Sequence, residues 1–343
     1  MKKLLNTLYV TIPDTYLALD GENVVVLKGN ETMLRVPLHN LESIVAFGYT
    51  GASPKLMGIC AERKISLSFH STSGRFLASV IGVEQGNVLL RRTQYRLADN
   101  EEASIRIARN MLVGKLYNSR WVLERALRDH AMRVDTEKLK EVSSFLVGSV
   151  QRMRIVETLD TARGIEGEAA NQYFSVFDEL ILQNKEDFSF RARSRRPPTD
   201  RVNAMLSFSY SLLAAELSSA ISAVGLDPFV GFLHQDKPGR RSLALDLMEE
   251  LRSVFADRFV ISMINTKQVK ASDFVQKESG AVLLKDESRK AFISSWQTRK
   301  QEKIEHPFLK EKIEWGLVPH VQALLLARYL RGDLDEYPPF LWK

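Results

Sequence analysis

Glu166 is the residue that most strongly indicates chemistry, because it falls on the apolar face of a predicted helix. The segment 164–181 reads GIEGEAANQYFSVFDELI. At 100° per residue, Glu168 points away from Glu166. The face shared with Glu166 is formed by Ala169, Ala170, Tyr173, Phe177 and Leu180. A carboxylate on such a face must be paired, hydrogen-bonded, neutralised or bound to a metal, because burying a bare charge is too costly.

Two structural explanations for Glu166 stand beside a functional one. If the helix starts near Gly164, Glu166 lies in the first turn, where the helix dipole favours a carboxylate. Alternatively, Glu166 pairs with one of the many arginines. Glu168 needs neither explanation, because its outward direction predicts a solvated side chain.

A second informative stretch runs from Gly231 to Leu251. His234 ends an apolar run and precedes a turn marked by Lys237, Pro238 and Gly239. A helix is predicted to begin near Ser242, a suitable N-cap. Its apolar stripe is Leu243, Leu247, Leu251 and Val254.

Three acids, Asp246, Glu249 and Glu250, flank that stripe. Taken alone, they fit a solvated flank of the helix, just as a lone histidine in a turn is usually structural. Together with Glu166, however, they offer an imidazole and carboxylate oxygens. One histidine and two carboxylates are a ligand set that suits Mg²⁺ or Mn²⁺.

Other site chemistries lack support in the sequence. The chain has one cysteine, Cys60, in an apolar stretch that predicts a core position, and it has no paired Cys or His spacing for zinc. It contains no Gly-x-Ser-x-Gly elbow. Neither a phosphate-binding Gly-x-x-x-x-Gly-Lys-Ser/Thr loop nor a Gly-x-Gly-x-x-Gly turn is present.

Four motifs around these residues resemble the CRISPR-associated spacer integrases, the family of the first Cas protein. They are RGIEGEAAxxYF at 163–174, NAMLSFSY at 203–210, GLDPFVGFLH at 225–234 and KPGRxSLALDLME at 237–249. The likeness extends over essentially the whole chain. The order and spacing of the four motifs are far more specific than any one of them.

The resemblance implies a divalent metal site formed by Glu166, His234 and Glu249. This chain has Glu249 where other members of the family carry Asp, so Asp246 is a reserve candidate for the third ligand. His234 is expected to be a ligand rather than an acid or base. The implied cofactor is Mg²⁺ or Mn²⁺.

The resemblance also implies an activity and partners. A metal-dependent integrase and endonuclease inserts spacer DNA into a CRISPR array by phosphoryl transfer, when a 3′-hydroxyl attacks a phosphodiester of the repeat. The expected partners are double-stranded DNA, a second copy of the chain, and a bridging dimer of the second Cas protein. A branched-DNA nuclease or resolvase and a non-catalytic DNA-binding scaffold are the alternative functions.

The distribution of positive charge also suggests a nucleic acid partner. The chain has 48 Lys and Arg against 42 Asp and Glu, a net charge of +6. Two basic clusters are predicted to bind DNA, since arginine matches phosphate oxygens. They are Arg191, Arg193, Arg195 and Arg196, followed by two prolines, and Lys237, Arg240 and Arg241 beside His234. The alternative for the first cluster is a solvated loop.

The sequence predicts an α+β protein with a small β-sandwich-like domain over residues 1–95 and a larger α-helical catalytic domain over 100–343. The first part, a dimerisation domain by resemblance, alternates β-rich runs with turns. Predicted strands are 16–19, 24–27, 33–36, 43–47, 65–69 and 76–81, with a short helix over 54–62. Asn100 is expected to cap the first long helix. Within the helical part, 259–263 is predicted as a strand, and 274–284 as a hairpin with its turn at Ser279 and Gly280.

The sequence favours a location in the cytoplasm, and the resemblance implies that the cell is prokaryotic. A single cysteine argues against a disulfide framework. No run of about 18 apolar residues predicts a membrane span. The start of the chain, Met1–Asn6, is basic but lacks the sustained apolar region of a signal peptide.

Overall fold

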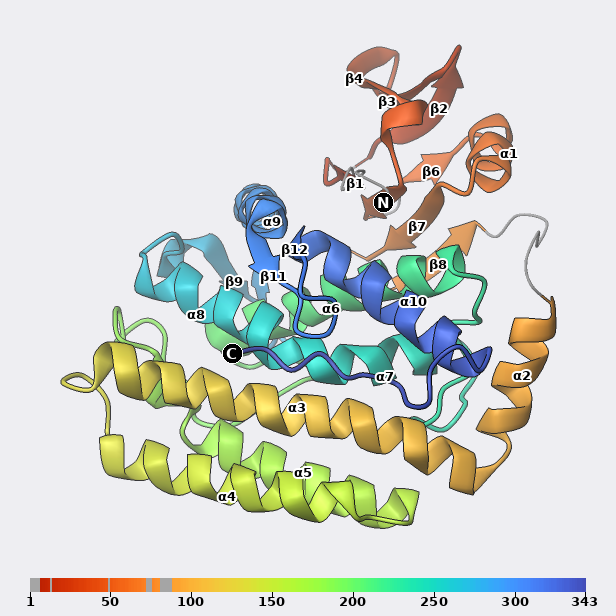
Figure 1. Cartoon of the computed structure of the whole chain (residues 1–343). Coiled ribbons are helices and arrows are strands. Elements are labelled where there is room, and N and C mark those ends of the chain that lie inside the picture. Colours follow the sequence, from red (N-terminus) through yellow and green to blue (C-terminus); the bar gives the residue numbers. More distant parts are fainter. Residues whose placement is uncertain (1–6, 13, 49, 72–75, 81–87) are drawn as a thin grey trace. The chain divides into compact units, whose positions relative to one another are not determined.

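The computed structural model describes residues 7–12, 14–48, 50–71, 76–80 and 88–343 (Figure 1). It is 54% helix and 16% strand, with the sheets near the N-terminus and the helices after them, which confirms the predicted α+β class. The chain forms two compact units. The first contains Met1–Gly86, Leu284–Glu302 and Trp315–Leu317, and the second contains the remainder.

One sheet of the first unit is built on the predicted hairpin. The strands β2 (Tyr16–Asp20) and β3 (Asn23–Lys28) pair antiparallel, and β4 (Glu31–Pro37) and β6 (Gly51–Ala52) complete the order β4-β3-β2-β6. The turn between β2 and β3 contains Gly21 at φ +57°, a left-handed conformation that costs glycine little.

The second sheet has the order β1-β5-β7-β8. Its strands are β1 (Thr7–Val10), β5 (Ser43–Phe47), β7 (Ser66–His70) and β8 (Phe76–Val80). Both sheets and the helix α1 (Pro54–Glu62) contribute to one hydrophobic core, in agreement with the sandwich-like prediction. Cys60 is fully buried in that core, and burial raises the pKa of its thiol to about 11, as expected for an inert cysteine.

Most predicted strands of this unit are confirmed within one or two residues, and the predicted helix over 54–62 matches α1. The last residue of the predicted strand 76–81, Ile81, lies outside the described residues. Met1–Asn6, which bears on the signal-peptide prediction, also lies outside them.

The second unit is built from long helices, and α3 packs lengthwise against α4 (Figure 1). Its main helices are α2 (Val88–Ala98), α3 (Glu101–His130), α4 (Thr136–Arg154), α5 (Leu159–Ser175), α6 (Arg201–Ala223), α7 (Ser242–Leu251), α8 (Arg258–Asn265) and α10 (Val318–Leu330). Two shorter helical segments matter for the site: the 3₁₀ segment η2 (Phe177–Leu180) and the π-helical segment η3 (Arg252–Asp257).

Helix α3 is the longest helix among the described residues, and its ends follow from the sequence. The Asn100 side chain accepts a hydrogen bond from the backbone N–H of Ala103 at 2.9 Å, which confirms the predicted cap. Acids in its first turn and basic residues in its last turn complement the helix dipole. Gly114 allows close packing on α7, because a Cβ at this position would lie 2.9 Å from the Cβ of Glu250.

The predicted strand over 259–263 is wrong, because these residues lie in α8. Phe259, Val260, Met263 and Ile264 are buried, a spacing that fits one face of a helix. The run of apolar and β-branched residues suggested a strand, but the buried face has the helical period. The predicted hairpin is confirmed as the pair β9 (Phe274–Gln276) and β10 (Val282–Leu284).

The division into units differs from the predicted boundary at two places. Residue 95 falls inside α2, which belongs to the second unit. Gln94 on that helix is fully buried and donates to the carbonyls of Asp227 and Val230 at 2.8 Å. The helix α9 (Asp286–Gln301) belongs to the first unit rather than to the helical one, and its Arg299 lies over the ring of Trp315.

Helix α6 is long and apolar enough to cross a membrane by length and composition. However, 61% of its most apolar window is buried inside the protein, where α6 packs against α7 and α10. Its apolar character is therefore explained by its place in the core of the second unit.

Candidate functional site

Glu166 lies well inside α5 rather than in its first turn. The helix begins at Leu159, seven residues before Glu166, and the Thr158 side chain caps it. The apolar face is confirmed by Ala169 and Tyr173, both buried. The Glu166 side chain is 26% exposed, and that of Glu168 is 50% exposed and pairs with Arg152, as its outward direction predicted.

The partner of Glu166 is a lysine rather than an arginine. The ammonium of Lys115, on α3, contacts Oε1 of Glu166 and lies 2.6 Å from Oε2 of Glu249. The side chains of Lys115 and Glu249 are each only 6% exposed. Two carboxylates from α5 and α7 therefore meet at one buried cation, although they are far apart in the sequence.

Glu249 carries a second ion pair, in which Nη1 of Arg252 lies 3.2 Å from Oε2 of Glu249. Burial raises the pKa of the Glu249 carboxyl, but the positive charges of Arg252 and Lys115 outweigh burial and hold that pKa at about 2. Glu249 is therefore an anion at neutral pH despite its burial.

The solvated-flank explanation for the three acids of α7 is wrong. Asp246 and Glu250 are 0% exposed and Glu249 is 5% exposed. The predicted apolar stripe of this helix is nevertheless confirmed, since all four of its residues are buried. Helix α7 is thus surrounded on its polar flank as well, and each acid has buried partners.

Asp246 holds the loop that carries His234. Oδ2 of Asp246 accepts the backbone N–H groups of Phe232 at 2.6 Å and Leu233 at 3.0 Å. Oδ1 accepts the backbone N–H of His234 at 3.0 Å and lies 2.6 Å from Nδ1 of the His234 ring. Because a carboxylate only accepts hydrogen bonds, Nδ1 donates to Asp246, which leaves Nε2 as the ring nitrogen available to a ligand.

Two further features hold this loop against the site. A Cβ at Gly231 would lie 2.8 Å from Oδ2 of Asp246, so only glycine allows the backbone to approach this closely. Arg163 on α5 donates to the carbonyl of Leu233 at 2.7 Å, which ties the helix of Glu166 to the residue before His234.

The remaining buried acids of this region have other partners. Glu250 accepts hydrogen bonds from Tyr337, Gln322 and the backbone N–H of Phe340, which fixes the C-terminal segment, and burial raises its pKa to about 7. Asp257 accepts from Tyr173 and Tyr210, and burial raises its pKa to about 6. Both acids are therefore structural in this arrangement.

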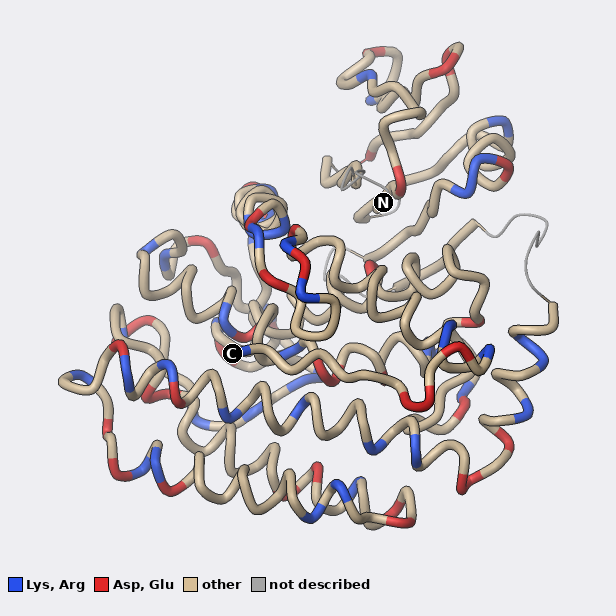
Figure 2. The backbone as a smooth tube through the Cα atoms, viewed as in Figure 1, with Lys and Arg blue, Asp and Glu red and all other residues tan. Residues whose placement is uncertain are grey.

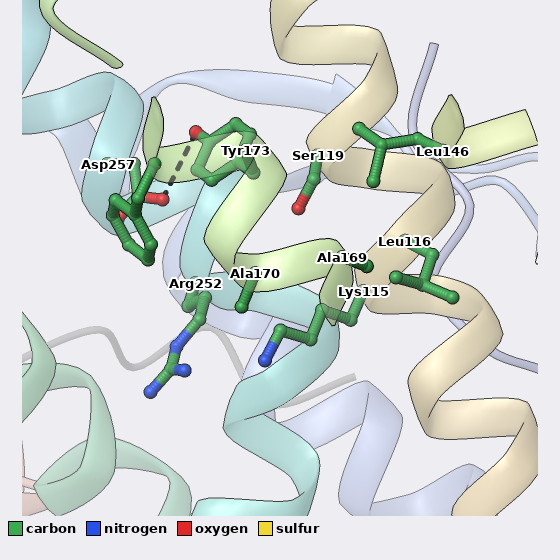
Figure 3. Close-up of a pocket in the computed structure, with 10 residues that line it drawn as sticks. Lys115, Leu116, Ser119, Leu146, Ala169, Ala170, Tyr173, Arg252 and Asp257 are labelled. Carbon is green, nitrogen blue, oxygen red and sulfur yellow. Dashed lines mark hydrogen bonds between the residues drawn. The ribbon is translucent and has the colours of Figure 1, made fainter. Parts of the chain in front are cut away.

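A small cavity lies beside Lys115 between α3, α5 and η3 (Figure 3). Figure 3 shows Lys115 and Arg252 extending with their charged ends on one side, away from the hydrogen bond that joins Tyr173 to Asp257. The cavity has a volume of about 10 Å³, which is room for one water molecule at most. This cavity is too small for a substrate.

The first basic cluster is divided by the structure. Arg191, Arg195 and Arg196 are exposed. Arg193 is half-buried, donates to Asn203 at 2.6 Å and to Ser207 at 3.0 Å, and lies 5.3 Å from the ring centre of Tyr210. Its guanidinium is therefore used inside the protein, and its role as a DNA contact stays a prediction.

The second basic cluster lies next to His234 in sequence, with Lys237 exposed and Arg240 and Arg241 half-buried. Burial lowers the pKa of Arg241 to about 10. Elsewhere, acidic and basic residues are interspersed along α3 and α4 (Figure 2). The basic side chains most available to a polyanion near the site are therefore on loops.

The donor set fits a hard divalent cation, although it is not preassembled. Within the described ranges, no three His, Cys, Asp or Glu side chains converge at ligating distances. Glu166 and Glu249 converge on the Lys115 nitrogen, and Arg163 ties the loop of His234 to the helix of Glu166. Two carboxylates and an imidazole with a free Nε2 are ligands for Mg²⁺ or Mn²⁺.

Sequence reasoning missed Lys115, Arg252 and the orienting contact of Asp246. One signal for Lys115 was available, because Met111 and Leu112 lie four and three residues before it and both are apolar. A lysine on the apolar face of a helix is as unusual as Glu166 on its own face.

The sequence matches a family model described as CRISPR associated protein Cas1 over residues 8–298. It is 51% identical over 343 residues to a protein of Chlorobaculum tepidum named CRISPR-associated endonuclease Cas1 1, and each chain is covered in full. A protein of Rhodospirillum rubrum named CRISPR-associated endonuclease Cas1 2 is also 51% identical, again with both chains fully covered.

Solved structures show the same fold at lower identity. A structure named "Casposase bound to integration product" has a TM-score of 0.82 and 24% identity, covering 98% of this chain and 94% of the other. A structure named "Cas6-RT-Cas1--Cas2 complex" has a TM-score of 0.83 and 23% identity, covering all of this chain and 36% of the other.

Proposed function

The chain belongs to the Cas1 family of CRISPR-associated proteins, and from this membership and the geometry around Lys115 we propose that it is a divalent-metal-dependent DNA integrase and endonuclease. The observation that carries the proposal is the convergence of Glu166 and Glu249 on one cation. The names of the full-length relatives, which call them endonucleases, support it as well.

In the proposed reaction, the 3′-hydroxyl of a spacer DNA attacks a phosphodiester of the CRISPR repeat. The attacking hydroxyl gives up its proton as a bond forms between the spacer 3′-oxygen and phosphorus. The bond from phosphorus to the 3′-oxygen of the repeat strand breaks, and the departing oxygen takes up a proton. Water in place of the spacer hydroxyl gives strand hydrolysis, which is the endonuclease activity. When bound, Mg²⁺ or Mn²⁺ supplies positive charge beside the scissile phosphate.

The side chains have distinct roles in this proposal. Glu166 and Glu249 provide anionic oxygens for the ion, and His234 provides Nε2 as a third ligand. Asp246 fixes the ring of His234 through Nδ1 and is a positioning residue, because all of its near partners are hydrogen-bond donors. This favours Glu249 over the reserve candidate Asp246 as the third ligand.

The proposed partners follow from family membership. We propose that two copies pair through the β-rich unit and that dimers flank a dimer of the second Cas protein, which is named in one structure of the same fold. DNA in a prokaryotic cytoplasm is the proposed substrate. The small size of the cavity beside Lys115 is compatible with an extended polymer that binds across an open surface.

The test is the joining of a labelled DNA duplex to a supercoiled plasmid that carries a CRISPR repeat, with Mg²⁺, with Mn²⁺ and with a chelator. The proposal predicts joining with either metal and none with the chelator, with the second Cas protein present. Cutting without joining would favour a branched-DNA nuclease or resolvase. Binding without any strand chemistry would favour a DNA-binding scaffold.

The exposed arginines Arg191, Arg195 and Arg196 are expected to contact phosphates rather than bases. Replacing all three with glutamine should weaken binding to unrelated duplexes about equally, because phosphate contacts carry no sequence information. The slope of log K against log salt should flatten by about 0.9 for each phosphate that the variant no longer neutralises. Binding is measured by fluorescence anisotropy at several salt concentrations.

A control with the same change in charge uses exposed cations that already have acidic partners, namely Arg106, Arg128 and Lys138. Their replacement should leave the salt slope unchanged. If the loop variant also keeps the wild-type slope, the loop is merely solvated. A loss of affinity confined to one DNA sequence would indicate base readout instead.

A further inference from the structure

Lys115 is a buried cation placed where two proposed metal ligands meet. Its side chain is 6% exposed, and its ammonium contacts one oxygen of Glu166 and one of Glu249. The lysine projects from α3, while its partners come from α5 and α7. An ammonium in this position holds the two helices together through ion pairs to both carboxylates.

The charges joined by ion pairs at Lys115 balance without a metal ion. The cluster contains two cations, Lys115 and Arg252, and two anions, Glu166 and Glu249. A divalent ion bound to the carboxylates would add two positive charges to a largely buried group. Such an excess is unfavourable unless a cation leaves the carboxylates or a new anion arrives.

We propose that Lys115 stands in the place of the metal in the free protein and leaves Glu166 and Glu249 when a divalent ion and a DNA phosphate bind together. The inference rests on the proposed function and deepens it, because it assigns to Lys115 the coupling of metal binding to DNA binding. The released ammonium and Arg252 then face an anion, and a phosphate oxygen of DNA restores the balance of charge.

This exchange has a reciprocal consequence for affinity. DNA strengthens metal binding, and metal strengthens DNA binding by the same factor. In DNA-free protein the lysine competes with the ion, so the site binds metal more weakly until its substrate is present. Lys115 is thus a positioning and gating residue for the proposed reaction.

The test is a titration with Mn²⁺, followed by the electron paramagnetic resonance signal of the free ion. Wild type, Lys115→Met and Lys138→Met are compared, each with and without a duplex whose 3′ ends lack the attacking hydroxyl. Lys138 is the matched control, because it is an exposed lysine paired with a glutamate, Glu179. Thermal unfolding is measured in parallel, with and without Mn²⁺.

Lys115→Met is expected to bind Mn²⁺ about tenfold more tightly than wild type in the absence of DNA, because a competing charge is gone. DNA should then strengthen Mn²⁺ binding much less than in wild type. The variant should unfold at a lower temperature without metal, and Mn²⁺ should restore most of the difference. Lys138→Met should behave as wild type in every titration.

Equal or weaker Mn²⁺ binding by Lys115→Met, alongside measurable binding by wild type, would overturn the exchange but leave the proposed metal site intact. Absence of Mn²⁺ binding by all three proteins, with and without DNA, would refute the metal site itself. If Lys115→Met does not fold, Lys115→Gln serves instead. Its amide can still donate to one carboxylate but carries no charge, and the same tighter binding is expected.

Discussion

Glu249→Gln is expected to abolish DNA joining while leaving DNA binding, measured without divalent metal, within about twofold of wild type. Glutamine keeps the size of the side chain but removes the anionic oxygen that the proposed ion requires. A bound ion contributes several kcal/mol to transition-state stabilisation, so its absence should lower the joining rate by about 10³-fold or more. Glu166→Gln and His234→Ala should have the same effect on joining.

Stability separates these variants from one another. Lys115 and Arg252 both pair with the buried carboxylate of Glu249, and Glu249→Gln removes that shared anionic partner. Breaking one side of a buried pair typically costs about 3 kcal/mol or more, so this variant should unfold at a lower temperature. Glu166 is more exposed, and its replacement should have a smaller effect on unfolding.

The matched control for these variants is Glu168→Gln. Glu168 is two residues from Glu166 on the same helix, but it is half exposed and pairs with Arg152. Full joining activity is expected for this variant in the plasmid assay. If Glu249→Gln retained wild-type activity, the assignment of the third ligand would be wrong, and Asp246 would have to be reconsidered.

Asp246→Asn is expected to lower both stability and joining, but for a different reason. The Asp246 carboxylate accepts three backbone N–H groups and the ring N–H of His234. An amide has one oxygen and a donor group, so at least one buried donor is left without an acceptor. Each such unpaired donor costs about 1–3 kcal/mol.

The His234 ring should also lose its fixed orientation in Asp246→Asn. Partners that orient a metal-bound histidine typically contribute about 10–100-fold in metal affinity or activity. Mn²⁺ binding should therefore weaken by that factor in a calorimetric titration, and not disappear. Complete loss of Mn²⁺ binding in a folded Asp246→Asn protein would identify Asp246 as a ligand.

The helical period of the sequence was enough to find Glu166, but not its partner. The prediction depended on residues within one helix, where periodicity fixes relative direction. Lys115 lies 51 residues earlier on another helix, and only tertiary packing brings it to Glu166. The sequence thus predicts that Glu166 needs a partner, but it does not predict which residue that partner is.

The acids of α7 show a second limit of sequence patterns. The stripe of leucines was predicted correctly, but the three acids, considered without Glu166, predict a solvated flank of the helix. In the structure the C-terminal segment covers Glu250 through Tyr337 and Phe340, and the loop before α7 covers Asp246. Both covering segments lie outside the helix, so the periodicity of the helix does not predict them.

The strand predicted over 259–263 failed for a related reason. A short apolar run in the sequence is compatible with either a strand or a buried helix. Here the packing of the folded protein favours the helix α8. In the first unit, by contrast, turn residues mark the ends of the strands. The turn at Gly21 between β2 and β3 is one example, and there the predicted strands agree with the structure.

Whether Glu166, Glu249 and His234 bind one metal ion can be seen directly in crystals of the protein with a DNA duplex and Mn²⁺, where anomalous scattering locates the manganese. We expect a single strong peak in contact with carboxylate oxygens of Glu166 and Glu249 and with Nε2 of His234. The Lys115 ammonium should no longer lie between the two carboxylates. A peak bound to Asp246 or away from Glu166 and Glu249, or no peak with DNA in place, would show that these three side chains do not form the metal site.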